Sequence, residues 1–540
     1  MSTDKGTAER VGLRRAAPVV IAAGALGWLL LLVLSAGRIR DELAATLHRD
    51  EAIAWTYASL PLRDIPDALT LDVNPPVYFL ALHTWLSGGG SGETYLRVLS
   101  VLAILGAAAV SFDAARRLGG RRAGWLASVF VVLAPSTLAL AGLARPYALA
   151  FLLGAIALDA AIVMVRGGSG WSVAVLGVSG ALLPLTHYWG GLLLASVLLG
   201  VAVTAALTGR RWLLTRTVIA TGIALVAAIP WVSTLLEQLG NHPLAAHQVP
   251  SADLLGTTLT KGMGGRTTAW VLAVVAALAV LGLARRWWRT GERPRPRPIS
   301  DPGRLFLVTT TIAAVASILL LWGVSQVRPL FSPNYAFIVL APIPIVVGVW
   351  LSARRWTMAA VVVALVLVSL PDFSRSAFPS GPWDRESRGP EYRIATALQR
   401  TTAPGDVVVT SPGRVLAIRY YLGEDREYVT PIGRVTEGTF DFRDRVARLQ
   451  AIDPAAVTAS IAQQPPGTRI AFVHDSGAPW DHPYWVELDR AMDALGRQLV
   501  ATDQLTQVRD YRIPGPNDAI DLWVFEVDGA DPGVQQASAP

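Results

Sequence analysis

The chain has 540 residues, of which 52% are hydrophobic and 16% are charged, and its mean hydropathy is +0.43. This apolar content exceeds what a soluble core of this length requires, so the composition excludes an ordinary soluble protein and favours one built for lipid. The sequence contains no cysteine, which excludes disulfide bonds, thiolate catalysis and zinc sites made of thiolates.

Apolar runs long enough to cross a bilayer recur through the first two thirds of the chain. A membrane-spanning helix needs roughly 20 residues, and the runs predict about eleven spans. They are expected at residues 17–36, 95–112, 123–141, 147–165, 171–187, 190–208, 217–236, 268–284, 305–323, 335–352 and 357–370. The first run lacks a small-residue cleavage signal, so we expect it to remain as a helix rather than to be removed as a signal peptide.

Arginine marks one side of these spans. Lys and Arg are retained on the cytoplasmic side, and Arg14 and Arg15 precede the first span. The same side then carries Arg116, Arg117, Arg121, Arg122, Arg210, Arg211, Arg216, Arg285, Arg286, Arg289, Arg354 and Arg355. The sequence therefore predicts a multi-pass plasma-membrane protein with a cytoplasmic N-terminus. Its formal charge of +7 indicates contact with membrane lipids and no nucleic acid partner.

The composition changes after the last predicted span. Residues 405–410, 469–473 and 520–525 show strand patterns, and residues 484–499 show a helical one. Since an odd number of spans leaves the C-terminus outside, we expect an extracytoplasmic α/β domain over residues 372–540, following a transmembrane domain over residues 1–371.

Short polar motifs gather at the predicted external ends of the spans. The first external loop, residues 37–94, contains the adjacent acids Asp50 and Glu51. Neighbours on a helix project about 100° apart, so only one of the two is expected to face a common site. The same loop contains the run Asn74-Pro75-Pro76-Val77-Tyr78, in which the prolines fix a turn before a helix. Later external boundaries contribute Arg145, Tyr147, His187, Tyr188, Arg328, Asn334 and Tyr335.

The order and membrane side of these motifs resemble the GT-C glycosyltransferases that use polyprenyl-phosphate sugars. More closely, they resemble the bacterial relatives of protein O-mannosyltransferases and the lipid A aminoarabinose transferase. The resemblance implies an α-helical polytopic fold with its catalytic centre in the first external loop. It also implies transfer of a sugar, mannose or arabinose, from a polyprenyl-phosphate donor to a cell-envelope glycan, lipid or protein acceptor. A single base opposite the leaving group would make the transfer inverting.

The resemblance assigns Asp50 as the catalytic base and gives Glu51 an orienting role. The leaving phosphate needs a positive charge, and the guanidinium of Arg145 can bind phosphate by two hydrogen bonds. Tyr147 and Arg328 are the other two residues predicted to bind the donor phosphate. The residues expected to shape the site are Asn74, Pro75, Pro76, Tyr78, His187, Tyr188, Asn334 and Tyr335. The plainer interpretations are that Asp50 and Glu51 cap a helix and that Arg145 reaches toward lipid headgroups.

Two positions depart from the family pattern. Relatives commonly carry Lys or His where Asn74 stands, and often Arg where Asn334 stands. The positive charge that these side chains supply would here have to come from Arg145, Arg328 or a bound cation. Some relatives bind a divalent metal ion at this face, so the sequence leaves open whether this protein uses such an ion as a cofactor. His187 alone is weak support for it, and a hydrogen-bonded histidine in an aromatic belt is the preferred interpretation.

Three further interpretations concern function. Consecutive residues cannot converge as a catalytic triad, so His474-Asp475-Ser476 is expected to be a turn after a strand. A transporter or flippase of an envelope lipid is the main alternative, although it would be expected to show paired repeats and interrupted helices. A non-catalytic envelope-assembly protein is the other, and Asn74 and Asn334 favour it.

Overall fold

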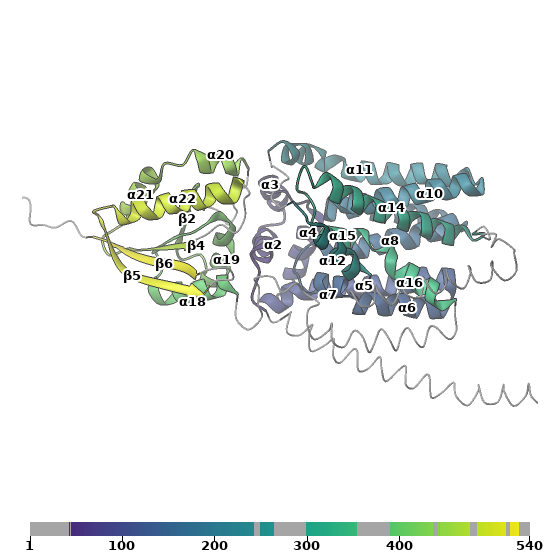
Figure 1. The fold of residues 1–540 in the computed structure, drawn as a ribbon, viewed down its shortest axis with the longest axis horizontal. Coiled ribbons are helices and arrows are strands. Elements are labelled where there is room, and N and C mark those ends of the chain that lie inside the picture. Colours follow the sequence, from purple (N-terminus) through teal and green to yellow (C-terminus); the bar gives the residue numbers. More distant parts are fainter. Residues whose placement is uncertain are drawn as a thin grey trace, which may run out of the picture.

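The computed structural model describes residue 43 and residues 45–241, 249–263, 299–353, 389–435, 441, 443–475, 483–514 and 519–528. The spans predicted at 17–36, 268–284 and 357–370 lie outside the described residues, so the count of eleven stays a prediction. The same holds for the boundary between residues 371 and 372. Figure 1 shows a bundle of long helices beside a sheet flanked by helices.

Among the described residues before Glu93, three short helices follow one another: α2 (Arg49–Ser59), α3 (Ile65–Thr70) and α4 (Val77–Leu86). Helix α2 begins in a capping box, in which His48 Nδ1 accepts a hydrogen bond from Asp50 N and Glu51 Oε2 accepts one from His48 N. Pro76 directly precedes α4, as the sequence predicts. The helices share a buried core that includes Tyr57, Ile65, Leu69, Tyr78, Phe79 and Leu82.

Five of the described helices are long and apolar enough to cross a membrane: α5 (Glu93–Gly119), α8 (Tyr147–Val165), α10 (Gly190–Thr208), α11 (Trp212–Asn241) and α14 (Pro302–Val324). A shorter apolar helix, α9 (Gly170–Thr186), lies between α8 and α10 in sequence. The ends of α8, α9 and α10 agree closely with the predicted spans. A short helix, α12 (Ala252–Gly262), follows α11.

Two predicted spans are not continuous, so their prediction as single helices was wrong. The run at 123–141 divides into α6 (Arg121–Leu133) and α7 (Pro135–Ala141), and the run at 335–352 divides into α15 (Pro333–Val339) and α16 (Pro342–Ser352). The second pair is bent by 53°. In each case the second helix begins at a proline, which has no N–H to continue the preceding helix.

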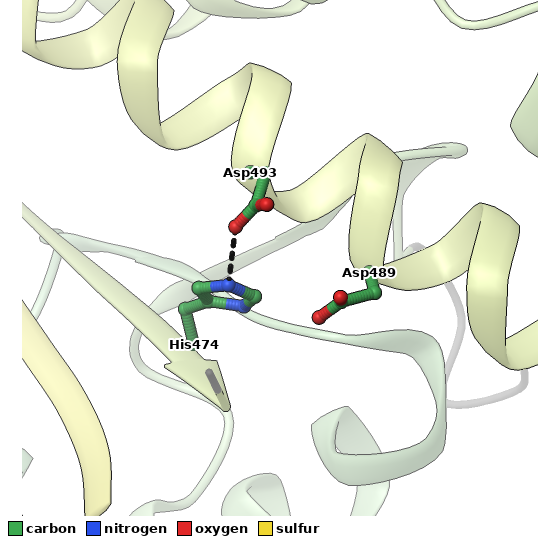
Figure 2. Close-up of side chains that lie close together, drawn as sticks. All are labelled: His474, Asp489 and Asp493. Atoms are coloured by element: carbon green, nitrogen blue, oxygen red, sulfur yellow. Dashed lines mark hydrogen bonds and ion pairs between the residues drawn. The ribbon is translucent and has the colours of Figure 1, made fainter. Parts of the chain in front are cut away.

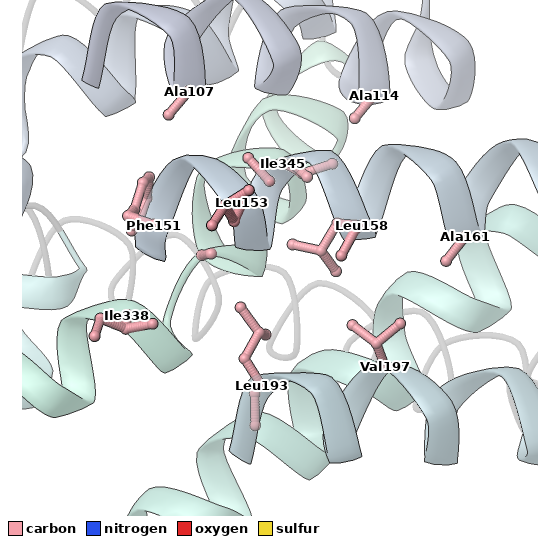
Figure 3. Packing of buried hydrophobic residues seen from close by; sticks show 14 of the residues in the cluster. Ala107, Ala114, Phe151, Leu153, Leu158, Ala161, Leu193, Val197, Ile338 and Ile345 are labelled. Carbon is pink, nitrogen blue, oxygen red and sulfur yellow. The ribbon is translucent and has the colours of Figure 1, made fainter. Parts of the chain in front are cut away.

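Small residues bring the long helices close together. Ala107 and Ala114 of α5 and Ala161 of α8 are buried, and larger side chains such as Phe151 and Leu193 fill the remaining space (Figure 3). Without a hydrophobic driving force between helices in lipid, this close packing is what stabilises such a bundle.

The C-terminal part contains one sheet of six strands in the order β3-β2-β1-β4-β6-β5. The strands are β1 (Val407–Val409), β2 (Glu427–Thr430), β3 (Gly433–Arg434), β4 (Arg469–Asp475), β5 (Leu505–Pro514) and β6 (Ala519–Val527). Strand β1 is parallel to β2 and β4, and the other pairs are antiparallel. The predicted strands correspond to β1, β4 and β6.

Helices cover both faces of this sheet (Figure 1). Successive side chains of a strand point to opposite faces. Val408 accordingly packs in one core with α18 (Pro390–Thr401) and α19 (Pro412–Leu422). Val407 and Val409 pack in another with α20 (Arg445–Gln450), α21 (Pro454–Ala462) and α22 (Pro483–Val500).

The sheet unit directly contacts α2 and the residues just before it. The amide of Leu47 donates to the hydroxyl of Tyr421 at 2.7 Å, and the rings of Trp55 and Tyr420 meet edge to face at 4.9 Å between centroids. The start of α2 is therefore held from two sides, by the helical bundle and by α19.

Candidate active site at the start of helix α2

Glu51 is buried and fully engaged by neighbouring donors. Its carboxylate accepts hydrogen bonds from Arg97 Nε at 2.8 Å, Arg97 Nη2 at 2.6 Å and the amide of Ala144 at 2.8 Å, besides that of His48. Burial opposes its ionisation, but the Arg97 guanidinium and these hydrogen bonds outweigh that effect and hold the pKa of Glu51 below its ordinary value. Glu51 thus ties α2 to α5 and to the loop before α8.

Asp50 points the other way. Its side chain is 50% exposed, whereas that of Glu51 is 1% exposed. Arg145 Nη2 lies 4.0 Å from Asp50 Oδ2. The two acids therefore diverge as helical geometry requires, and Asp50 is the one that solvent can reach.

Arg145 lies between α7 and α8 with its side chain 12% exposed. Its Nη1 donates to the main-chain carbonyl of Asp50 at 3.0 Å, while its buried Nε has no hydrogen-bond partner among the described residues. Burial acts against the charge of the guanidinium, but Asp50, Tyr147 and Asp72 together outweigh burial and raise the pKa of Arg145. The site therefore contains a permanent cation beside the exposed carboxylate of Asp50, and within the described structure this cation retains one unsatisfied N–H.

Aromatic rings line the region next to Arg145. The guanidinium carbon of Arg145 is 5.9 Å from the ring centroid of Tyr147, and the ring of His187 lies 5.2 Å from that of Tyr147 and 4.9 Å from that of Tyr335. Trp189 stacks on Tyr335 at 5.7 Å. Tyr147 also interacts with Asn334, so α8, the end of α9 and α15 meet at this point.

Some residues predicted for the site lie apart from this group. The hydroxyl of Tyr188 bonds to Gln238 and accepts from Trp231 Nε1, which fastens the start of α10 to α11. Arg328 is exposed beyond the end of α14, and no hydrogen bond or ion pair joins it to Arg145 within the described part of the chain. Asn74 donates to Asp72 Oδ2 at 3.0 Å, and Pro75 is buried. Tyr78, by contrast, is buried close enough to Arg145 and Tyr147 to interact electrostatically with both.

Sequence reasoning missed two charged residues of this region. Asp72 is 6% exposed and acts electrostatically on Arg145. Arg97 holds Glu51 and donates to the carbonyls of Leu43, Ala45 and Thr46. An acid two residues before Asn74 was a visible signal for Asp72, whereas a lone arginine at the start of a span gave none for Arg97.

The residues able to hold a metal ion lie elsewhere. His187 belongs to no group of three or more possible metal ligands among the described residues. In that same set of residues, the group of histidine and acids close enough to share one ion is His474, Asp489 and Asp493. His474 belongs to β4, so the sequence interpretation of a turn at this position was wrong.

The fold is that of the GT-C glycosyltransferases, as the sequence motifs predicted. The apo structure of ArnT from Cupriavidus metallidurans aligns over 95% of this chain and 98% of ArnT, with a TM-score of 0.54 at 16% identity. Its structure with undecaprenyl phosphate aligns over 94% and 97%, with a TM-score of 0.50 at 15% identity. The mycobacterial arabinofuranosyltransferase AftD aligns over 93% of this chain and 42% of AftD, with a TM-score of 0.44 at 16% identity.

The sequence itself matches no protein-family model and no curated protein. The chain is thus a multi-pass membrane protein with a GT-C fold, established by structure at low sequence identity.

Proposed function

We propose that this protein is a membrane glycosyltransferase that takes a sugar from a polyprenyl phosphate and transfers it to a cell-envelope acceptor outside the cytoplasm. The observation that carries the proposal is the pairing of the half-exposed Asp50 with the buried cation Arg145, whose Nε lacks a partner in the described structure. The likeness to ArnT, which has been crystallised with undecaprenyl phosphate, supports a polyprenyl carrier.

In the proposed reaction, a hydroxyl oxygen of the acceptor attacks the anomeric carbon while the bond from that carbon to the phosphate oxygen breaks. Asp50 takes the proton from the hydroxyl. The polyprenyl phosphate leaves with a second negative charge, which the guanidinium of Arg145 stabilises. Attack opposite the leaving group inverts the anomeric configuration.

The aromatic group of Tyr147, His187, Trp189 and Tyr335 is proposed to shape the donor site. Tyr147 presents its phenol beside Arg145 and Asn334. Arg328 is proposed as a second residue that contacts the phosphate. Binding of the donor lipid would have to bring Arg328 closer to Arg145. Mannose and arabinose are the proposed sugars, and glycans, lipids and proteins of the envelope are the proposed acceptors.

The sheet unit is proposed to lie outside the cytoplasm above the site, where it would cover the donor or bind the acceptor. Its contacts with α2 support this placement. A cytoplasmic N-terminus and an external first loop follow from the arginine pattern and belong to the same proposal.

The test is transfer by the purified full-length protein in lipid nanodiscs. Radiolabelled mannosyl- and arabinosyl-polyprenyl phosphates are offered with envelope extracts as acceptors, and nucleotide sugars serve as the control donor. We expect label to move from a polyprenyl phosphate to an acceptor and not from a nucleotide sugar. In sealed proteoliposomes, labelled lipid that crosses the bilayer with its sugar still attached would instead support the flippase alternative.

A further inference from the structure

The face of the sheet unit covered by α22 presents a histidine and two acids to one point. His474 comes from the end of β4, and Asp489 and Asp493 come from successive turns of α22 (Figure 2). Residues four apart lie on one face of a helix, so both carboxylates are directed toward the histidine ring. His474 Nε2 lies 2.8 Å from Asp493 Oδ1.

We propose that these three side chains bind a divalent transition-metal ion, with Zn²⁺ as the first candidate. One ligand atom from each residue lies within 4.8 Å of the other two. Zinc binds histidine nitrogen and carboxylate oxygen at about 2.0–2.2 Å, so ligand atoms around it are about 3–3.5 Å apart. Small side-chain rotations close the remaining gap, and they carry no backbone cost because the three residues already face one another.

The charge and burial of the group fit a cation. Two carboxylates four residues apart on a helix repel each other, and a divalent ion would remove that repulsion. His474 is 6% exposed whereas the acids are partly exposed or exposed, so the ion would enter from the α22 side.

A pocket of about 370 Å³ adjoins His474 and Asp493, with Phe472, Trp523 and Arg497 also in its wall. Three protein ligands leave a fourth position on zinc for water or another molecule, and this pocket supplies room for it. The site lies in the sheet unit, so it is separate from the Asp50 and Arg145 group and does not depend on the proposed transfer reaction.

The experiment measures metal binding by the full-length protein purified without a histidine tag. After removal of metal, Zn²⁺ and then Mn²⁺ are titrated by calorimetry, and the thermal midpoint of unfolding is recorded with and without metal. We expect one ion per chain and a rise in the midpoint. Asp489→Asn and His474→Gln should each weaken binding by more than about tenfold, while Asp510→Asn, an exposed acid of β5, should leave it unchanged.

Asp489→Asn separates this proposal from a purely hydrogen-bonded arrangement, because it leaves the contact between His474 and Asp493 intact. If the three side chains form only a charged hydrogen-bonded group, metal will not raise the midpoint of the parent protein and Asp489→Asn will lower its metal-free midpoint. That result, or metal binding that neither Asp489→Asn nor His474→Gln weakens, would overturn the proposal.

Discussion

Glu51 and Arg97 form a buried ion pair in which both nitrogens of one guanidinium edge donate to one carboxylate, at 2.8 and 2.6 Å. The pair joins α2 to α5 and occupies both oxygens of Glu51. Its neighbour Asp50 is left to face solvent. The position of Asp50 therefore depends on Glu51, and each residue can be tested by a different measurement.

The first prediction concerns Asp50 as the base. Asp50→Asn keeps the size of the side chain and removes its affinity for a proton, so we expect turnover to fall by roughly 10²- to 10⁴-fold with donor binding retained. Asp64→Asn is the matched control, because Asp64 lies in the same loop with a side chain 49% exposed against 50% for Asp50. Equal turnover of the two variants would show that Asp50 is not the base.

The second prediction concerns Arg145 and the donor phosphate. Arg145→Lys keeps a charge but loses the planar fork, whereas Arg145→Gln loses the charge as well. We expect both to lower turnover at saturating donor, Gln more than Lys, because the charge on the phosphate grows toward the transition state. Full activity of both variants would return Arg145 to contact with lipid headgroups alone.

The third prediction concerns stability. Glu51→Gln leaves the buried charge of Arg97 without its partner, which should lower the free energy of unfolding by roughly 3–5 kcal/mol. Turnover per folded molecule should fall less than in Asp50→Asn. Glu424→Gln, which removes an exposed partner of Arg419, serves as the control and should cost under about 1 kcal/mol.

The same ion pair predicts a pH dependence. Because the folded-state pKa of Glu51 lies below its ordinary value of 4.5, its contribution to stability is fully present above that value. The contribution is lost as the pH falls through the folded-state pKa. Thermal midpoints measured from neutral to acid pH should therefore fall more steeply for the parent than for Glu51→Gln. Parallel curves would argue against a stabilising Glu51 carboxylate.

A fourth prediction concerns the contact between α2 and the sheet unit. Tyr421→Phe removes the acceptor of the Leu47 amide, which should cost about 1–3 kcal/mol and increase amide exchange at the start of α2. Tyr511→Phe, which removes an exposed hydrogen bond with Arg509, is the control. Unchanged exchange at residues 47–50 in Tyr421→Phe would show that α19 does not hold this helix.

The fifth prediction concerns topology. The chain has no cysteine, so each introduced thiol is the only one present. A thiol at exposed Gln507 should react with a membrane-impermeant reagent in intact cells, and a thiol at exposed Ser300 should react only after the membrane is opened. The reverse pattern would place Asp50 in the cytoplasm and remove the basis of the proposed reaction.

The sequence predicted the long helices well because their signal is continuous. Uninterrupted apolar composition located α8 and α10, and loop residues such as Gly209 marked their ends. The prediction failed at Pro135 and Pro342, where the apolar run continues although the preceding helix ends before the proline. Hydropathy alone records what lipid accepts, not whether the helix is unbroken.

The parts of the candidate site that depend on residues adjacent in sequence could be predicted. The contacts between residues far apart in sequence could not. Helical geometry separates Asp50 from Glu51 without a structure. The partner of Glu51 is 46 residues away, and His474 meets an acid 19 residues away. Such pairs depend on tertiary packing, which a single sequence does not reveal.

The hydrogen bond from the amide of Gly389 to the hydroxyl of Thr46, at 2.6 Å, joins residues 343 positions apart. At typical translation rates of roughly 5–20 residues per second, about 17 to 70 s separate the synthesis of these two partners. The residues just before α2 therefore lack this contact while most of the chain is still being made. The contacts that support the start of α2, next to Asp50, consequently form late in biosynthesis, after the sheet unit has been translated.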